Sequence, residues 1–170
     1  MRILTLVLIL SFSKVAFSEV KMTFSEYQSD LKIKEVNASY DAVSFSGEIK
    51  ASGTIVFRLD RLSDSEFGDP LFVDFIPDQD QLILFPEVIS GFYAKKVERI
   101  SLLGTKGLYQ QLFGHHSKST VREVRKYGTV QIEAFGTSIE CDARRYYAKL
   151  IKFTVIDVYA SINNQAISGC

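Results

Sequence analysis

The clearest alternation of apolar and polar positions lies in residues 127–158. One set of alternating residues is Val130, Ile132 and Ala134, and the opposite set is Gln131, Glu133 and Phe135. This period of two predicts a strand with one buried face. Gly136-Thr137-Ser138 has turn composition, and the β-branched and aromatic residues of 139–158 predict one bent strand or two shorter ones after it. We therefore expect a β-hairpin whose turn lies at 136–138.

A second alternating stretch covers residues 43–60. Its apolar positions are Val43, Phe45, Ile49, Ile55, Phe57 and Leu59. Ala51-Ser52-Gly53 separates the two apolar runs and supplies small turn residues. The pattern predicts a second hairpin with its turn at 51–53.

The remaining elements are shorter. Residues 71–76 predict a strand, 77–81 a polar turn, and 82–85 a short apolar strand that Pro86 ends. Residues 87–103 fit a helical face or interrupted strands, and we expect a strand for 97–103. The glycine-containing segment 104–126 predicts short helical turns.

Many short strands at this spacing predict a mainly β fold, a single small barrel or sandwich with one or two short helices. The series Gly128-x-Val130-x-Ile132-x-Ala134-x-Gly136-Thr137 resembles the strand that begins the last hairpin in small OB-like barrels of exported bacterial proteins. That resemblance covers about ten residues. It implies an OB-like β-barrel, and a module that binds another molecule.

The first 18 residues have the organisation of an export signal. Arg2 gives a positive start, Ile3 to Leu10 is an apolar run, and Ala16-Phe17-Ser18 provides small residues before a cleavage point. The alternative is an uncleaved anchor, although Lys14 interrupts the run before the length that spans a membrane. We expect residues 1–18 to be removed, and residues 19–170 to form one domain that is periplasmic or secreted.

The two cysteines, Cys141 and Cys170, both lie in the exported part. In an oxidising compartment such a pair predicts a disulfide, and closing a loop of about 30 residues contributes roughly 3.5 kcal/mol. A reactive thiol or a metal-binding pair is the alternative. The expected disulfide attaches the polar C-terminal tail to the strand that carries Cys141.

Charge limits the classes of partner. Export removes two of the 20 basic residues and none of the 20 acidic ones, so the mature chain is nearly neutral, which argues against a nucleic-acid-binding protein. Residues 41–90 hold ten acidic and three basic side chains, whereas residues 91–152 hold five acidic and twelve basic ones. The fold either interleaves these segments or presents a basic face.

No pattern for catalysis, cofactor binding or metal binding is complete. His115 and His116 are the only histidines, and adjacent residues on a strand point to opposite faces, so a solvated loop pair or a pH-sensitive contact is the expected role. Asp78-Gln79-Asp80 lacks the glycine and distal glutamate of a calcium loop. We expect neither a cofactor nor a metal.

The candidate binding residues are Arg144, Arg145, Tyr146 and Tyr147, together with the two histidines. On a strand, Arg144 and Tyr146 share one face and Arg145 and Tyr147 the other, so one pair should be exposed and the other should pack inward. Arginine and tyrosine are frequent in interface hot spots. The alternative is that both pairs are structural.

These features lead to two main hypotheses of function. The first is an exported, non-enzymatic binding module that recognises another protein, such as a toxin or a hydrolase, or an anionic envelope component through a basic and aromatic face. The alternative is a small exported hydrolase with dispersed catalytic carboxylates. A structural subunit, the third possibility, would show a long edge strand or a large apolar patch.

Overall fold

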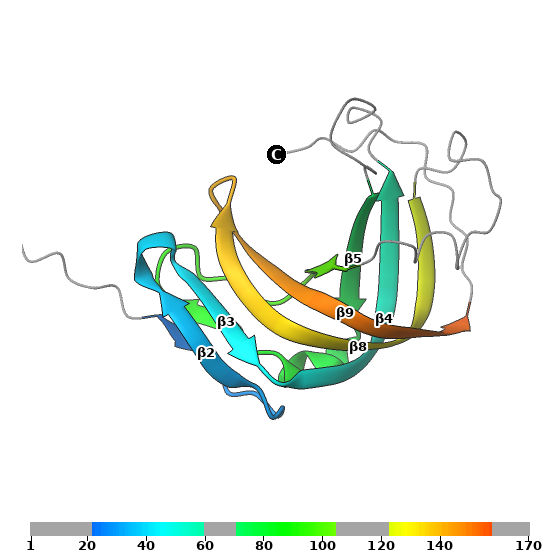
Figure 1. The fold of residues 1–170 in the computed structure, drawn as a ribbon, viewed down its shortest axis with the longest axis horizontal. Helices are drawn as coiled ribbons and strands as arrows, with labels where there is room; N and C mark the ends of the chain where they lie inside the picture. The colour runs from blue at the N-terminus through cyan, green and yellow to red at the C-terminus, as the bar shows by residue number, and fades with distance from the viewer. Residues whose placement is uncertain (1–21, 60–70, 105–122, 158–170) are drawn as a thin grey trace, which may run out of the picture.

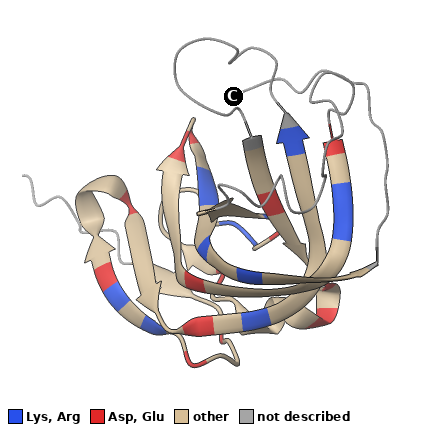
Figure 2. Cartoon of the chain, turned by 45° about the vertical axis from the view of Figure 1, so that its right-hand side comes forward, with Lys and Arg blue, Asp and Glu red and all other residues tan. Residues whose placement is uncertain are grey.

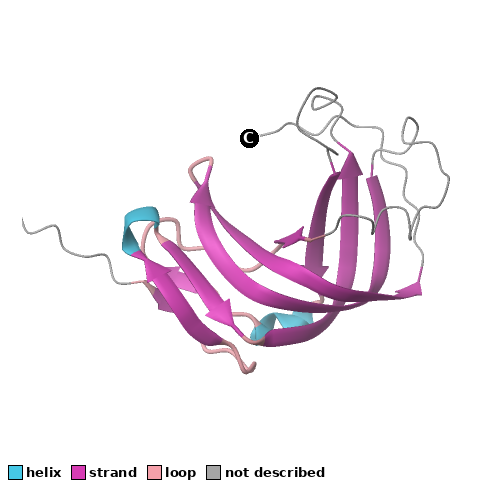
Figure 3. Ribbon diagram, in the orientation of Figure 1, coloured by secondary structure: helices cyan, strands magenta, loops and turns pink. Residues whose placement is uncertain are grey.

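The computed structural model describes residues 22–59, 71–104 and 123–157. These ranges are mainly strand, with two short 3-10 helices (Figure 3). The strands are β1 (Thr23–Phe24), β2 (Lys32–Asn37), β3 (Ala42–Ser46), β4 (Glu48–Leu59), β5 (Leu71–Pro77), β6 (Val88–Ser90), β7 (Ile100–Leu103), β8 (Glu123–Glu140) and β9 (Ala143–Asp157). The 3-10 helices are η1 (Ala38–Tyr40) and η3 (Gln79–Leu84).

Five of the strands close into a barrel. β4 pairs with β5 and β8, β5 pairs with β7, β7 runs parallel to β9, and β9 returns to pair with β8. Around the ring the strands therefore follow the chain order first, second, third, fifth, fourth, which is that of an OB-like Greek-key barrel. The expected fold class, a mainly β single small barrel or sandwich with one or two short helices, is confirmed. β8 and β9 curve across the whole molecule (Figure 1).

A second layer extends the barrel at one end. β3 follows the line of β4 along β8, with Gly47 (φ 113°) at the bend between them, and β2 pairs with the outer side of β3. β1 and β6 form a separate two-stranded sheet. The rings of Phe24 and Phe45 meet edge to face with 5.4 Å between centroids, so this small sheet packs against the inner face of β3.

The hairpin expected within residues 43–60 is wrong, because the chain does not reverse at 51–53. Ser52 and Gly53 lie inside β4 and pair with Thr129 and Gly128 of β8. Glycine at position 53 serves no turn; it allows β4 to lie close to β5. A Cβ there would lie 2.3 Å from the Ile76 carbonyl oxygen.

The turn expected at 136–138 is also wrong. β8 continues to Glu140, and the reversal occurs at Cys141 (φ 48°) and Asp142 (φ 55°). A bulge at Ala134 (φ 51°) shifts the register between Glu133 and Gly136. The bulge changes which face each residue occupies, so Ala134 is exposed and Phe135 is buried, the reverse of the expected alternation.

The shorter elements give a mixed result. The strand expected at 71–76 is confirmed as β5, and the later part of the strand expected at 97–103 is confirmed as β7. The strand expected at 82–85 is wrong, because η3 occupies most of it and the Phe85 N–H donates to the Leu82 carbonyl at 3.0 Å. Of the helical turns expected at 104–126, residues 105–122 lie outside the described ranges, and residues 123–126 belong to β8.

Candidate binding site

Arg144 is 1% exposed, and each N–H group of its side chain has an acceptor. Nε donates to the Tyr93 carbonyl at 3.0 Å, and Nη2 donates to the Phe92 carbonyl at 2.7 Å and to the Asp41 carboxylate. Nη1 donates to the Asp41 carbonyl at 3.0 Å and to Thr137 Oγ1 at 3.3 Å. A buried guanidinium with five satisfied donors fixes all the groups around it.

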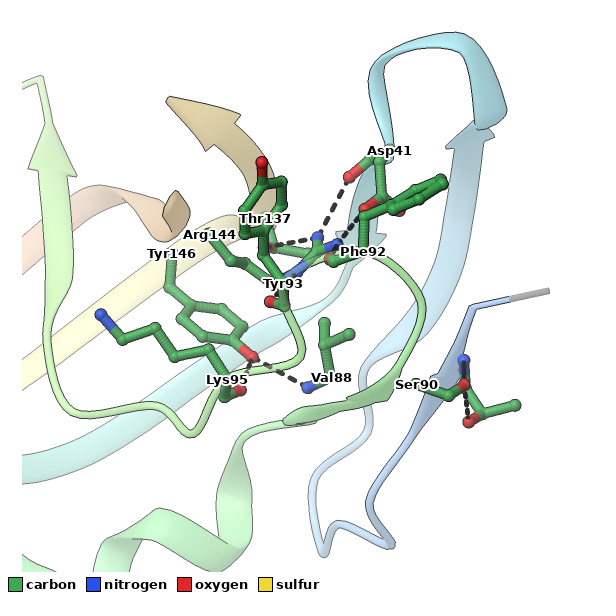
Figure 4. A network of polar contacts seen from close by, with 10 residues as sticks. Asp41, Val88, Ser90, Phe92, Tyr93, Lys95, Thr137, Arg144 and Tyr146 are labelled. Atoms are coloured by element: carbon green, nitrogen blue, oxygen red, sulfur yellow. Dashed lines mark hydrogen bonds and ion pairs between the residues drawn. The ribbon is translucent and has the colours of Figure 1, made fainter. Parts of the chain in front are cut away.

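Arg144 therefore joins two segments that are distant in sequence (Figure 4). Asp41 follows η1 in the β2–β3 connection, while Phe92 and Tyr93 lie in the loop after β6. Asp41 (φ 45°) and Tyr93 (φ 55°) both have left-handed backbone conformations, which are uncommon for residues other than glycine. Such conformations persist where surrounding contacts hold them, and here the contacts come from Arg144.

Tyr146 holds the base of the same loop. Its hydroxyl accepts the Val88 N–H at 2.8 Å and donates to the Lys95 carbonyl at 2.5 Å, while the Lys95 N–H donates to the Val88 carbonyl at 3.0 Å. The Tyr146 ring stacks on Phe135 with 5.8 Å between centroids. Burial raises the pKa of Tyr146 to about 12, although the Val88 N–H and the Arg144 charge both lower it. The phenol is therefore neutral at physiological pH.

The two clamped segments carry exposed aromatic rings. Tyr40 is 74% exposed, Phe92 60% and Tyr93 51%. We call these three residues the aromatic platform. Arg144 of β9 holds the backbone carbonyls of Phe92 and Tyr93 (Figure 4). It also holds Asp41, the residue after Tyr40. The platform thus combines a rigid base with accessible apolar area.

The expected alternation of Arg144 to Tyr147 is confirmed. Arg144 and Tyr146 point inward and are buried, Arg145 is exposed, and Tyr147 is half-buried on the outer face. The Tyr147 ring covers Gly136, where a Cβ would lie 2.5 Å from the ring. Burial raises the pKa of Tyr147, and the nearby carboxylates Glu35 and Glu140 raise it further. The four residues therefore lie on two faces and form no single patch.

Other expected site residues are outside the described part of the chain. His115 and His116 lie in the range 105–122, and Cys170 lies in the range 158–170. Cys141 is exposed at the tip of the β8–β9 hairpin. Its bond to Cys170 therefore stays a prediction.

The platform residues themselves were not expected from the sequence. Phe92 and Tyr93 follow Gly91 in a segment whose pattern fits either a helix or interrupted strands, and Tyr40 follows Asn37-Ala38-Ser39. A glycine next to two aromatic residues was the available signal. The two segments are both bonded to Arg144, which is about 50 residues from Phe92 and about 100 from Asp41 in the sequence.

The two oppositely charged segments are interleaved in the described ranges. Arg144 pairs with Asp41, and Arg99 lies 3.5 Å from the Asp74 carboxylate, so these two ion pairs join the basic segment to the acidic one. β4 of the acidic segment also lies beside β8 of the basic one. Acidic and basic residues are both scattered over the strands (Figure 2). Acidic residues of 41–90 therefore form ion pairs with basic residues of 91–152 within the chain.

Two further observations concern the described residues. Among residues 22–59, 71–104 and 123–157, no group of three or more histidine, cysteine, aspartate or glutamate side chains is arranged to hold a metal ion. In the same ranges, no helix has the length and apolar character needed to cross a membrane.

The chain was compared with protein-family models, curated proteins and solved structures, and no match was found.

Proposed function

We propose that this protein is an exported, non-enzymatic binding module that recognises another protein through the aromatic platform. The observation that supports this most directly is the Arg144 clamp. This fully buried charged side chain donates four of its five hydrogen bonds to the two segments that carry Tyr40, Phe92 and Tyr93, and the fifth to Thr137 on β8. Exposed rings on a fixed backbone are suited to recognition.

The energetic argument rests on preorganisation. Ordering a loop at an interface costs free energy on binding, and a loop that is already held in place avoids much of that cost. Tyrosine and phenylalanine supply large contact areas with few rotatable bonds, and aromatic residues are enriched at protein interfaces. The left-handed Tyr93 also places its ring where an ordinary backbone conformation would not.

The alternative partner is an anionic envelope component. Lys95 and Lys96 follow Tyr93 and flank the platform, and Lys96 is exposed. However, the accessible part of the platform is aromatic and not basic, which favours a protein surface. Single exposed lysines contribute little binding free energy by themselves.

Export and the disulfide belong to the same proposal. Cleavage after Ser18 would release the mature domain into an oxidising compartment, where Cys141 at the hairpin tip would bond to Cys170. Intact mass of the exported protein, before and after reduction and alkylation, tests both statements. A retained N-terminal segment contradicts the first, and two alkylated thiols without reduction contradict the second.

Site-specific photo-crosslinking in the native host tests the proposed function. A photoreactive phenylalanine analogue replaces Phe92 in one version and Phe72 in the control version, because Phe72 is equally exposed at 57% but lies on β5. The proposal predicts a discrete protein adduct from position 92 and none from position 72. No protein adduct at 92, a lipid or polysaccharide adduct instead, or equal adducts at both positions would contradict it.

A further inference from the structure

One edge of the sheet is open to another strand. β2 pairs with β3 on one side, and within the described ranges no strand pairs with its other side. All six residues of β2 are exposed, including Ile33 at 54% and Val36 at 55%. An exposed edge with apolar side chains is a template for pairing with a further strand.

A bulge gives this edge an unusual pattern of faces. Ile33 lies opposite Phe45 and Val36 opposite Val43, whereas the register shifts between Ile33 and Glu35 so that Lys34 is the additional residue. Phe45 and Val43 are both buried on the inner face of the sheet. Directly opposite residues share a face, so Ile33 and Val36 share the inner face despite being three positions apart.

The outer face completes the pattern. Lys32, Glu35 and Asn37 lie opposite Ser46, Ser44 and Ala42, and Lys34 joins Glu35 in the bulge that faces Ser44. From Lys32 to Asn37 the faces therefore read outer, inner, outer, outer, inner, outer. This order is the same in both chain directions.

A strand with this symmetry is complementary to a second copy of itself. A two-fold axis perpendicular to the sheet keeps inner residues on the inner face and reverses the strand direction. With the axis between Lys34 and Glu35, Ile33 meets the partner's Val36, Lys34 meets the partner's Glu35, and Lys32 meets the partner's Asn37. The register thus pairs apolar with apolar residues and opposite charges with each other.

We propose that two copies of this chain form a symmetric dimer through their β2 edges, in this register. The six residues of β2 include none of the aromatic platform, so the inference does not depend on the proposed partner. Lysines and bulges also serve to keep edge strands unpaired. Glu35 favours pairing, because in each copy its carboxylate lies opposite the partner's Lys34 and can form an ion pair with it.

The interface is small, so the dimer should form at high protein concentration. Standard stable interfaces bury about 800 Å² per partner, which is more than a six-residue strand provides. Sedimentation velocity over a range from about 1 µM to about 1 mM should therefore show a reversible monomer–dimer equilibrium. A wild-type protein that stays monomeric over the whole range would overturn the proposal.

Charge reversal tests the register. Lys34→Glu and Glu35→Lys each place like charges opposite one another twice per dimer, and each should raise the dimer Kd about tenfold or more. An equimolar mixture of the two variants should dimerise again, because glutamates of one copy then face lysines of the other. Lys50→Glu, an equal charge change at an exposed β4 position, should leave the Kd unchanged. Single variants that dimerise like wild type, or a mixture that remains monomeric, would refute the register.

Discussion

Arg144 and Tyr146 lie two residues apart on β9 and hold opposite ends of one loop. Arg144 donates to the carbonyls of Phe92 and Tyr93 at the tip, and Tyr146 bonds the backbone of Val88 and Lys95 at the base. Since β9 is paired along its length with β8, this support is part of the barrel itself. The loop is therefore fixed by two adjacent inward positions of a single strand.

Arg144→Lys should lower the free energy of unfolding by about 2–4 kcal/mol. Lysine keeps the charge, but its three donors on one nitrogen cannot reach acceptors on Asp41, Phe92, Tyr93 and Thr137 together. Urea denaturation measures the change. Arg145→Lys, on the exposed face of the same strand, is the matched control and should change stability by less than about 0.5 kcal/mol. Equal effects at the two positions would show that the buried network adds no stability.

Tyr146→Phe should cost about 1–3 kcal/mol. The substitution retains the ring that stacks on Phe135, but it leaves the Val88 N–H and the Lys95 carbonyl without their side-chain partner. Thermal and urea unfolding both report this loss. Tyr147→Phe, which removes a hydroxyl from the outer face, serves as the control. An unchanged stability for Tyr146→Phe would mean that water replaces the hydroxyl at no cost.

Stability should also fall in alkaline solution through Tyr146. Burial raises the pKa of its phenol from 10.0 to about 12, so between these values the folded state binds more protons than the unfolded state. The free energy of unfolding therefore decreases as pH rises through this window, by on the order of 2 kcal/mol, and the contribution is intact below pH about 10. Urea titrations of wild type and Tyr146→Phe isolate the effect. Parallel pH profiles for the two proteins would contradict it.

Two glycines should respond differently to alanine. A Cβ at Gly53 would lie 2.3 Å from the Ile76 carbonyl oxygen, which is backbone of a paired strand and cannot move alone. At Gly136 the obstacle is the ring of Tyr147, which is half-buried and can rotate. We expect Gly53→Ala to cost about 2–3 kcal/mol and Gly136→Ala about 1 kcal/mol or less. The reverse order in urea unfolding would contradict this packing argument.

Alternation of apolar residues was a sound guide to which segments form strands, and a poor guide to where the chain turns. Gly53 and Gly136 have turn composition but serve close packing inside β4 and β8. The real turn uses Cys141 and Asp142, whose positive φ values no local composition indicated. The bulge at Ala134 likewise reversed the faces beyond it, because its position depends on pairing with β9.

The candidate site was predictable only in part. The period of a strand was enough to separate Arg144 and Tyr146 from Arg145 and Tyr147, since that requires only local geometry. It could not identify what Arg144 binds, because Asp41 comes close only after the whole barrel has formed. The same arginine also holds the backbone of Phe92 and Tyr93, whose rings are exposed.

Hydrogen–deuterium exchange of wild type, Arg144→Lys and Arg145→Lys tests the clamp most directly. Arg144 bonds both the segment 38–41 and the segment 88–95, so its replacement should accelerate amide exchange in the two segments together. Arg145→Lys should leave both unchanged. The expected result is faster exchange in both segments for Arg144→Lys alone. Acceleration in only one segment, or in neither, would contradict the claim that one buried arginine organises the aromatic platform.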